Sequence, residues 1–440
     1  MRAGTAELNI TPEVGGLIPG QWLRRRAESV HDPLLVNALV LESEDERVAI
    51  VSADVVSLKA RVVAAARGLI ADMTGIRPDG ALLAATHTHT GPPVADALGT
   101  EADEAVVEAL PRAIATTIAR ANEQLRPALV ATWSGSAPGL AFPRRYHMRD
   151  GTVQMHPPKG SPEVLGPEDQ ADPTIAGFHI WAESGELLAA CINFACHPIV
   201  VGGACFYSAD YPGGVREALR RLHGPTATVV YLNGPCGDVG PDNVDDTARS
   251  RYGEEWVSRI GFGLAGFATG LSSVAQPRES LRLAVVSRQV RIGLRPVPDD
   301  LVRKAEATLS KEEIRTPPQD QERIRLREYL LLDRERREQD YVDAEITVMK
   351  VGDAAIVGLP GEVFADIGRR IRGASPFPHT IIAELANGCH GYVPTRKAFE
   401  GGGYETWLAR SSKLVPEAGD RMVAAATALL CQLEPGGEGG

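Results

Sequence analysis

The segment Ala81-Leu82-Leu83-Ala84-Ala85 is an apolar run of strand length, and Thr86-His87-Thr88-His89-Thr90-Gly91-Pro92 follows it directly. The same order, a short apolar run followed by a loop that contains Gly or Pro, recurs after residues 188–194, 228–232 and 346–357. Runs of this length that are rich in Val and Ile are typical of buried strands. Because segments of helical pattern separate several of these runs, the sequence predicts a mixed α/β fold in which sheet and helices form layers.

We expect strands at the apolar runs 35–41, 48–53, 81–85, 188–194, 228–232, 283–292, 346–357 and 380–385. We expect helices at 58–73, 104–124, 214–222, 254–271 and 363–371. These elements indicate one domain over residues 1–434. Residues 299–343 are dense in Glu, Arg and Leu and contain Pro317-Pro318, so they resemble a helical hairpin inserted into that domain. The Gly-rich residues 435–440 are expected to be a disordered tail.

The composition argues against several classes of protein. The 440 residues include 46 Lys and Arg against 57 Asp and Glu, which gives a formal net charge of −11 at pH 7. This acidity argues against a nucleic-acid-binding protein, because phosphates are bound by a basic surface. No run approaches the roughly 20 apolar residues of a membrane span, and no apolar leader follows Met1, so we expect a cytoplasmic protein. The six cysteines form no C-x-x-C pair and are expected to be free thiols.

The two histidines after residues 81–85 are the first candidates for chemistry. In an extended segment residues i and i+2 share a face, so His87 and His89 can point into one cavity at the end of the strand. Open α/β sheets bind ligands at this edge. The pair therefore indicates a metal site or an acid/base site, although a structural, hydrogen-bonded role would also explain either histidine.

Two later segments offer further candidates. His197, in Asn193-Phe194-Ala195-Cys196-His197-Pro198, also follows an apolar run and has the ring that zinc binds most often. Asp210 offers a carboxylate, or it caps a helix that Pro212 helps to start. The Gly/Pro-rich loop 233–242, which contains Gly240, allows the backbone to approach a ligand closely, or simply forms a turn.

A carboxylate and two phenols complete the candidates. Glu362, in Leu359-Pro360-Gly361-Glu362, is expected to open the helix that follows a strand, where the helix dipole alone would favour it. Tyr392 and Tyr404 lie in Gly-rich surroundings and could supply phenol donors to a site.

Together and in this order, these segments resemble the neutral/alkaline non-lysosomal ceramidase family, zinc amidases that cleave the N-acyl bond of ceramide. The opening Gly4-Thr5-Ala6 with Asn9-Ile10-Thr11-Pro12 is similar to the N-terminal signature of that family, and the resemblance extends to about Glu405. The resemblance implies four zinc ligands: His87, His197, Glu362 and Tyr392. It also implies an acid/base role for His89, a contact of Tyr404 with the substrate carbonyl, and a substrate-binding arginine, Arg144 or Arg145.

The sequence departs from this family in two respects. Gly240 stands where the family's ceramidases carry a serine in a G-D-x-S-P segment, so a serine nucleophile is impossible there. The chain is also expected to be a short form without the C-terminal immunoglobulin-like domain and the secretion signal. We therefore expect water activated by zinc to attack the amide of a soluble or short-chain substrate rather than membrane ceramide. Tyr404 would then stabilise the oxyanion, His89 would protonate the leaving amine, and Arg145, Asp210 and Gly240 would contact the substrate.

Other interpretations stay open at this point. An H-x-H pair also occurs in amidohydrolase barrels, which would need eight regular βα units and further ligands from later strands. A catalytically inactive relative that binds a ligand is a second alternative, with Gly240 as its best argument. A metal-dependent hydrolase of another small molecule, such as an ester, is a third. The sequence is compatible with a homo-oligomer but does not set the oligomeric state.

Overall fold

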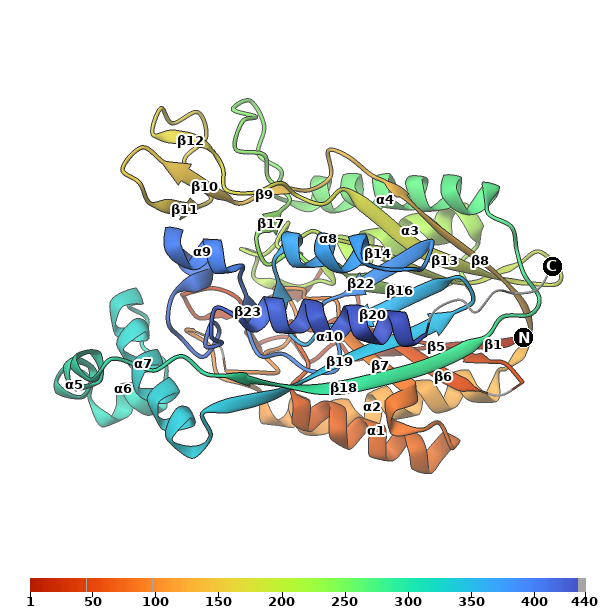
Figure 1. The fold of residues 1–440 in the computed structure, drawn as a ribbon, viewed down its shortest axis with the longest axis horizontal. Coiled ribbons are helices and arrows are strands. Elements are labelled where there is room, and N and C mark those ends of the chain that lie inside the picture. Colours follow the sequence, from red (N-terminus) through yellow and green to blue (C-terminus); the bar gives the residue numbers. More distant parts are fainter. Residues whose placement is uncertain (45, 97, 434–440) are drawn as a thin grey trace.

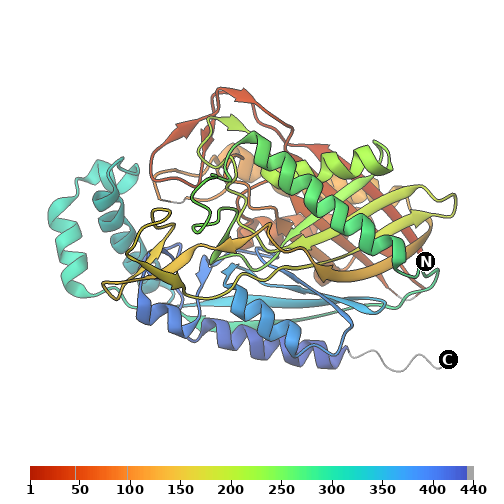
Figure 2. The ribbon, with the colours of Figure 1, turned by 90° about the horizontal axis from the view of Figure 1, so that it is seen from above.

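The computed structural model describes residues 1–44, 46–96 and 98–433. Two sheets pack face to face and helices cover the outer face of each, so the predicted mixed α/β layers are confirmed (Figure 1 and Figure 2). The core between the sheets takes Leu82 and Phe178 from the larger sheet and Met349 and Ile356 from the smaller one. The predicted tail, residues 435–440, lies outside the described residues.

The larger sheet has eight strands, all within the described residues. Across the sheet their order is β16 (Thr228–Asn233), β14 (Leu187–Phe194), β13 (Thr174–Ala182), β8 (Arg126–Ser136), β1 (Arg2–Asn9), β5 (Leu35–Glu42), β6 (Arg47–Ala53) and β7 (Ala81–Ala85). The pairs β14/β16 and β6/β7 are parallel, and the other neighbours are antiparallel. Five of these strands match predicted apolar runs. The sequence does not predict β1, β8 and β13, because Gly or polar residues interrupt their apolar pattern.

The smaller sheet has the order β18 (Leu283–Gly293), β19 (Tyr341–Val351), β20 (Ala354–Gly358) and β22 (His379–Ala383). The single strand expected over 346–357 is wrong, because β19 and β20 form an antiparallel hairpin. Gly352 lies in the turn between them at a left-handed φ of 62°, which glycine adopts without steric cost. The β20/β22 pair is parallel.

Within the described residues, six helices cover the two sheets. Their bounds are α1 (Ala60–Thr74), α2 (Glu104–Glu123), α3 (Asp210–His223), α4 (Glu254–Val274), α8 (Ala365–Gly373) and α10 (Ala418–Gln432). α1 and α2 pack on the β5 to β7 end of the larger sheet, and α3 and α4 pack on β13, β14 and β16. α8 and α10 cover the smaller sheet. The five predicted helices are confirmed, and α10 is an addition to them.

The predicted insertion is helical and contains α5 (Asp299–Thr308), α6 (Lys311–Arg315) and α7 (Gln321–Glu338). These helices project from one end of the molecule (Figure 1) and share a small apolar core around Val302, Leu309 and Leu330. α7 is attached to the rest of the chain by an ion pair of 2.7 Å between Glu328 and Arg410.

The remaining elements are short and belong to loops. They are β2 (Leu17–Ile18), β3 (Arg25–Arg26), β4 (Ser29–Val30), η1 (Pro78–Gly80), β9 (Phe142–Pro143), β10 (Arg145–Met148), β11 (Val153–Met155), β12 (Val164–Pro167), β15 (Phe206–Tyr207), β17 (Val239–Gly240), β21 (Glu362–Val363), β23 (Tyr392–Val393), α9 (Arg396–Gly401) and η2 (Tyr404–Thr406). Among the helices of the described chain, none combines the length and the apolar character that crossing a membrane requires. All six cysteines are free, as predicted.

The carboxyl ends of strands from both sheets meet at one place. The N–H of Ala85, at the end of β7, donates to the carbonyl of Leu385 just after β22 (3.2 Å). The N–H of Glu384 donates to the carbonyl of Asn233 at the end of β16 (2.9 Å). Because β14 runs parallel to β16 and β20 parallel to β22, the loops after all five strands begin close together. Most of the predicted site residues lie on these loops.

Candidate metal centre

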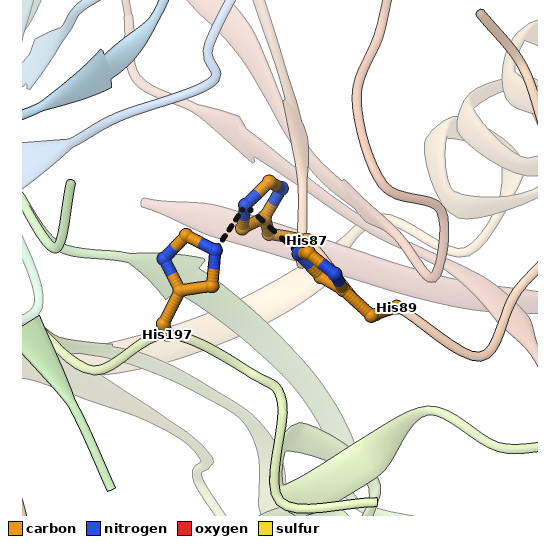
Figure 3. A group of neighbouring side chains, drawn as sticks. All are labelled: His87, His89 and His197. Atoms are coloured by element: carbon orange, nitrogen blue, oxygen red, sulfur yellow. Dashed lines mark hydrogen bonds between the residues drawn. The ribbon is translucent and has the colours of Figure 1, made fainter. Parts of the chain in front are cut away.

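Three imidazole rings converge where these loops meet. His87 Nε2 lies 3.0 Å from His197 Nε2 and 3.4 Å from His89 Nε2 (Figure 3). Each histidine has one ring nitrogen that lies within 4.8 Å of a ring nitrogen of the other two, a spacing that one metal ion could bridge. The rings of His87 and His89 thus lie side by side, and that of His197 joins them.

The second nitrogen of each ring is held by a backbone carbonyl. His87 Nδ1 lies 2.6 Å from the oxygen of Val56, and His197 Nδ1 lies 3.2 Å from that of Cys236. His89 Nδ1 is 3.3 Å from the oxygen of Gly20. Since a carbonyl only accepts, each ring, when it is neutral, carries its proton on Nδ1 and turns the Nε2 lone pair inward. Three lone pairs that face one another repel, and a cation between them removes that repulsion. The donor set therefore fits a metal ion.

His87 reaches this position from an unusual backbone conformation. Its φ is 70°, in the left-handed region that is rare for residues with a side chain. The segment after β7 is thus a turn and not the extended strand that the sequence suggests. The N–H of His87 donates to the carbonyl of Val55 (3.0 Å), which holds the turn in place. Backbone strain of this kind is found mainly at functional sites.

Glu362 faces the histidines from a two-residue parallel pairing of β21 with β23, in which Tyr392 is its direct partner. Glu362 Oε2 lies 3.4 Å from His87 Nε2 and 3.9 Å from His197 Nε2. Burial would raise the pKa of the Glu362 carboxyl, but the positive charge of a protonated His87 and a hydrogen bond from Tyr392 lower that pKa below its usual range, and Glu362 in turn raises the pKa of His87. The expectation that Glu362 opens a helix is wrong, because it lies in β21 and α8 begins only at Ala365.

Arg144 and Tyr404 both contact Tyr392. Arg144 Nη2 donates to the Tyr392 hydroxyl (3.1 Å), and its Nε donates to Glu405 (2.9 Å). The ring of Tyr404 is edge-on to that of Tyr392, with centroids 5.7 Å apart. Burial, and then Glu362, raise the pKa of the Tyr392 phenol well above its usual value, and the positive charge of the buried Arg144 guanidinium opposes this rise.

The other predicted residues occupy different surroundings. Arg145 is buried between Glu168 and Glu405, at 2.6 Å from each, and makes no contact with the histidines. Asp210 begins α3, and its carboxylate accepts the backbone N–H groups of Val201 (3.0 Å) and Tyr211 (2.6 Å). Gly240 does lie beside the site, because a Cβ there would be 3.8 Å from the Cβ of Arg144.

Sequence reasoning missed Glu384, which follows β22. Its carboxylate accepts the N–H groups of Cys236 (3.2 Å) and Val363 (2.8 Å), so it joins the loop whose carbonyl holds His197 to the strand that carries Glu362. Burial raises its pKa to about 8. The signal was present in the sequence, because Glu384 is a polar residue at the end of an apolar run. His87 and His197 likewise follow apolar runs.

A cavity of about 660 Å³ borders Tyr404. Trp22, Arg295, Arg325, Phe399 and Trp407 line it together with residues 153–155. The rings of Trp22 and Tyr404 are 5.9 Å apart, and Gly20, two residues earlier, holds His89. The cavity therefore adjoins the candidate metal centre through Tyr404 and the 20–22 segment.

The fold matches that of solved ceramidases. Neutral ceramidase from Pseudomonas aeruginosa superimposes with a TM-score of 0.75 at 20% sequence identity, over 98% of this chain and 75% of that one. A ceramidase complexed with C2 gives a TM-score of 0.73 at 19% identity, over 98% and 76% of the two chains. No protein-family model and no curated protein matches the sequence. The chain thus has the neutral ceramidase fold, which confirms the resemblance seen in the sequence at the level of the fold.

Proposed function

We propose that this protein is a zinc-dependent hydrolase that cleaves an amide bond of a small, soluble or short-chain substrate. The observation that carries this proposal is the convergence of three inward-facing imidazole nitrogens with the carboxylate of Glu362 at the ends of buried strands. The proteins with the same fold are ceramidases by name, which supports hydrolysis of an amide.

In this proposal His87, His197, Glu362 and Tyr392 would hold the zinc. Two neutral imidazoles, a carboxylate and a phenolate form a donor set that zinc accepts. When bound, zinc supplies a Lewis acid and lowers the pKa of a water molecule toward about 7. Arg144 contributes through Tyr392, because its charge at 3.1 Å favours the ionised phenol.

Two further side chains would act on the substrate. His89 carries its proton on Nδ1, held by the carbonyl of Gly20, so its Nε2 is free to take a proton and pass it to the leaving amine. The phenol of Tyr404, between the metal centre and the cavity, would donate to the carbonyl oxygen as negative charge develops there. No serine is required, in keeping with Gly240. A cytoplasmic location stays a prediction from the sequence.

The test combines metal content with turnover on the same samples. Zinc is measured by mass spectrometry in the wild type and in His197→Ala, and hydrolysis of acyl amides, lactams and esters is followed in parallel. We expect about one zinc per chain in the wild type and its loss with His197. Absence of metal, together with no hydrolysis after zinc is added, would contradict the proposal and favour an inactive ligand-binding protein. Faster turnover of esters than of amides would revise the bond that is cleaved.

A further inference from the structure

The cavity beside Tyr404 has an unusual charge distribution. Two arginines line it, Arg295 just after β18 and Arg325 on α7, and none of the described residues in its lining is acidic. In a protein of net charge −11, a cavity with two cations and no carboxylate stands out. A cavity of about 660 Å³ is in the size range of small-molecule sites.

Neither arginine forms an ion pair with any described residue. Arg295 donates through Nη2 to the carbonyl and the hydroxyl of Ser412, and its buried Nε has no hydrogen-bond partner among the described residues. Burial, without a carboxylate to oppose it, lowers the pKa of Arg295 to about 10, so the guanidinium stays charged at neutral pH. Arg323, Arg327 and Arg410, by contrast, each lie near a glutamate.

Aromatic rings hold both guanidinium groups in place. Arg295 lies over the ring of Phe399 (4.9 Å to the centroid), and Arg325 lies over that of Trp407 (4.6 Å). Trp407 in turn contacts Trp22, with centroids 5.6 Å apart. Stacking orders a guanidinium without neutralising it, so the N–H donors stay available for an oxyanion. The rings also give the cavity apolar walls that suit the carbon skeleton of a ligand.

We propose that this cavity binds an oxyanion of the substrate, so that the enzyme acts on amides that carry a carboxylate or a phosphate group in addition to an apolar part. This proposal rests on the proposed function and adds a substrate class to it. Arg295 and Arg325 would bind the anion and hold it, and the amide would then extend past Tyr404 to the metal centre. The insertion acquires a role, because α7 supplies Arg325.

The test compares substrates that differ only in the anion. N-hexanoyl-phenylalanine is set against its neutral carboxamide, and an N-acyl phosphoethanolamine against the matching N-acyl ethanolamine. We expect the zinc-loaded wild type to prefer the anionic member by at least about tenfold in kcat/KM, because hydrogen bonds to charged groups are worth that much. In Arg295→Met and Arg325→Met this ratio should fall toward one, mainly through KM. The preferred pair shows whether the anion is a carboxylate or a phosphate.

Arg323→Met is the matched control, because Arg323 lies on α7 but pairs with Glu313 and does not line the cavity. It should keep the wild-type ratio. Equal turnover of both members of each pair, or a preference that survives in both cavity variants, would overturn the proposal.

A binding measurement separates this proposal from the proposed function. Trp22 and Trp407 line the cavity, so quenching of tryptophan fluorescence by N-hexanoyl-phenylalanine reports binding without turnover. If no amide is hydrolysed but the anion binds at least about tenfold more weakly to the Arg295→Met variant, the anion site stands and the hydrolase proposal fails. If hydrolysis occurs but anion and carboxamide bind equally well, only the anion site is wrong.

Discussion

At the residue scale, the orientation of each imidazole ring depends on a backbone carbonyl that contacts its Nδ1 atom. Gly20 is the clearest example, because a Cβ at this position would lie 2.2 Å from Nδ1 of His89. Only glycine lets the backbone carbonyl approach the ring closely enough to accept its proton. Sequence patterns predicted His87, His89, His197, Glu362 and Tyr392 because each follows a strand or sits in a recognisable segment. They could not predict Gly20, because its partner His89 lies 69 residues further along the chain. Glu384 was missed although it stands at the end of an apolar run, because its contacts with Cys236 and Val363 are set by the fold.

Replacing Gly20 by alanine tests how His89 acts. We expect Gly20→Ala to displace the His89 ring and to lower kcat/KM by at least about tenfold, as misplacement of a catalytic group does. Gly15→Ala is the matched control, since Gly15 also has a positive φ (104° against 86°) but nothing lies within 4 Å of its added Cβ. If His89 is an acid/base group, Gly20→Ala keeps its zinc; loss of zinc would instead make His89 a ligand. Activity equal to that of Gly15→Ala would contradict both roles.

At the element scale, the insertion shows what composition can and cannot predict. The density of Glu, Arg and Leu over 299–343 correctly indicated helices, with the Pro317-Pro318 break between α6 and α7. It did not indicate where α7 packs, because that depends on Arg410 and Trp407, more than 70 residues further on. The hairpin β19/β20 was missed for a local reason, because only two residues, Gly352 and Asp353, interrupt the apolar run that contains both strands.

The attachment of α7 can be tested at Glu328. This buried carboxylate accepts three hydrogen bonds from Arg410, and Glu328→Ala leaves that arginine without its closest partner. We expect a loss of at least about 2 kcal/mol in the free energy of unfolding. Faster proteolysis within 299–338 should accompany it, as α7 detaches. Glu322 also lies on α7 but forms only an exposed pair with Lys304 of α5, so Glu322→Ala should cost well under about 1 kcal/mol. Equal stability of the two variants would show that α7 is held by apolar contacts alone.

At the scale of the whole molecule, the layer order follows from pairings that the sequence does not reveal. The apolar runs predicted most of the strands, but the centre of the larger sheet is built from β13, β8 and β1, whose apolar pattern is interrupted. Within β13, His179 is fully buried and accepts a hydrogen bond from Trp133 Nε1 (2.9 Å). A buried neutral histidine in the middle of the fold makes the stability of the whole molecule depend on pH.

The sign of that dependence follows from the pKa in the two states. Burial, and then the nearby His223, lower the pKa of His179 to about 3, whereas an unfolded histidine has a pKa of about 6.5. Between these values the unfolded chain binds the additional proton, so the free energy of unfolding falls as the pH falls below about 6.5. From pH 7 to pH 5 His179 alone should remove about 2 kcal/mol.

Urea unfolding of the wild type and of His179→Gln at pH 7 and pH 5 measures this contribution. Glutamine offers Trp133 an oxygen acceptor and cannot be protonated, so the variant should lose about 2 kcal/mol less than the wild type over this interval, whatever its stability at pH 7. All other titrating groups are common to both proteins and cancel in the comparison. An equal loss in the two proteins would mean that His179 takes up its proton in the native state as readily as in the unfolded chain. The centre of the larger sheet would then have to admit a charge that the burial of β13 is expected to exclude.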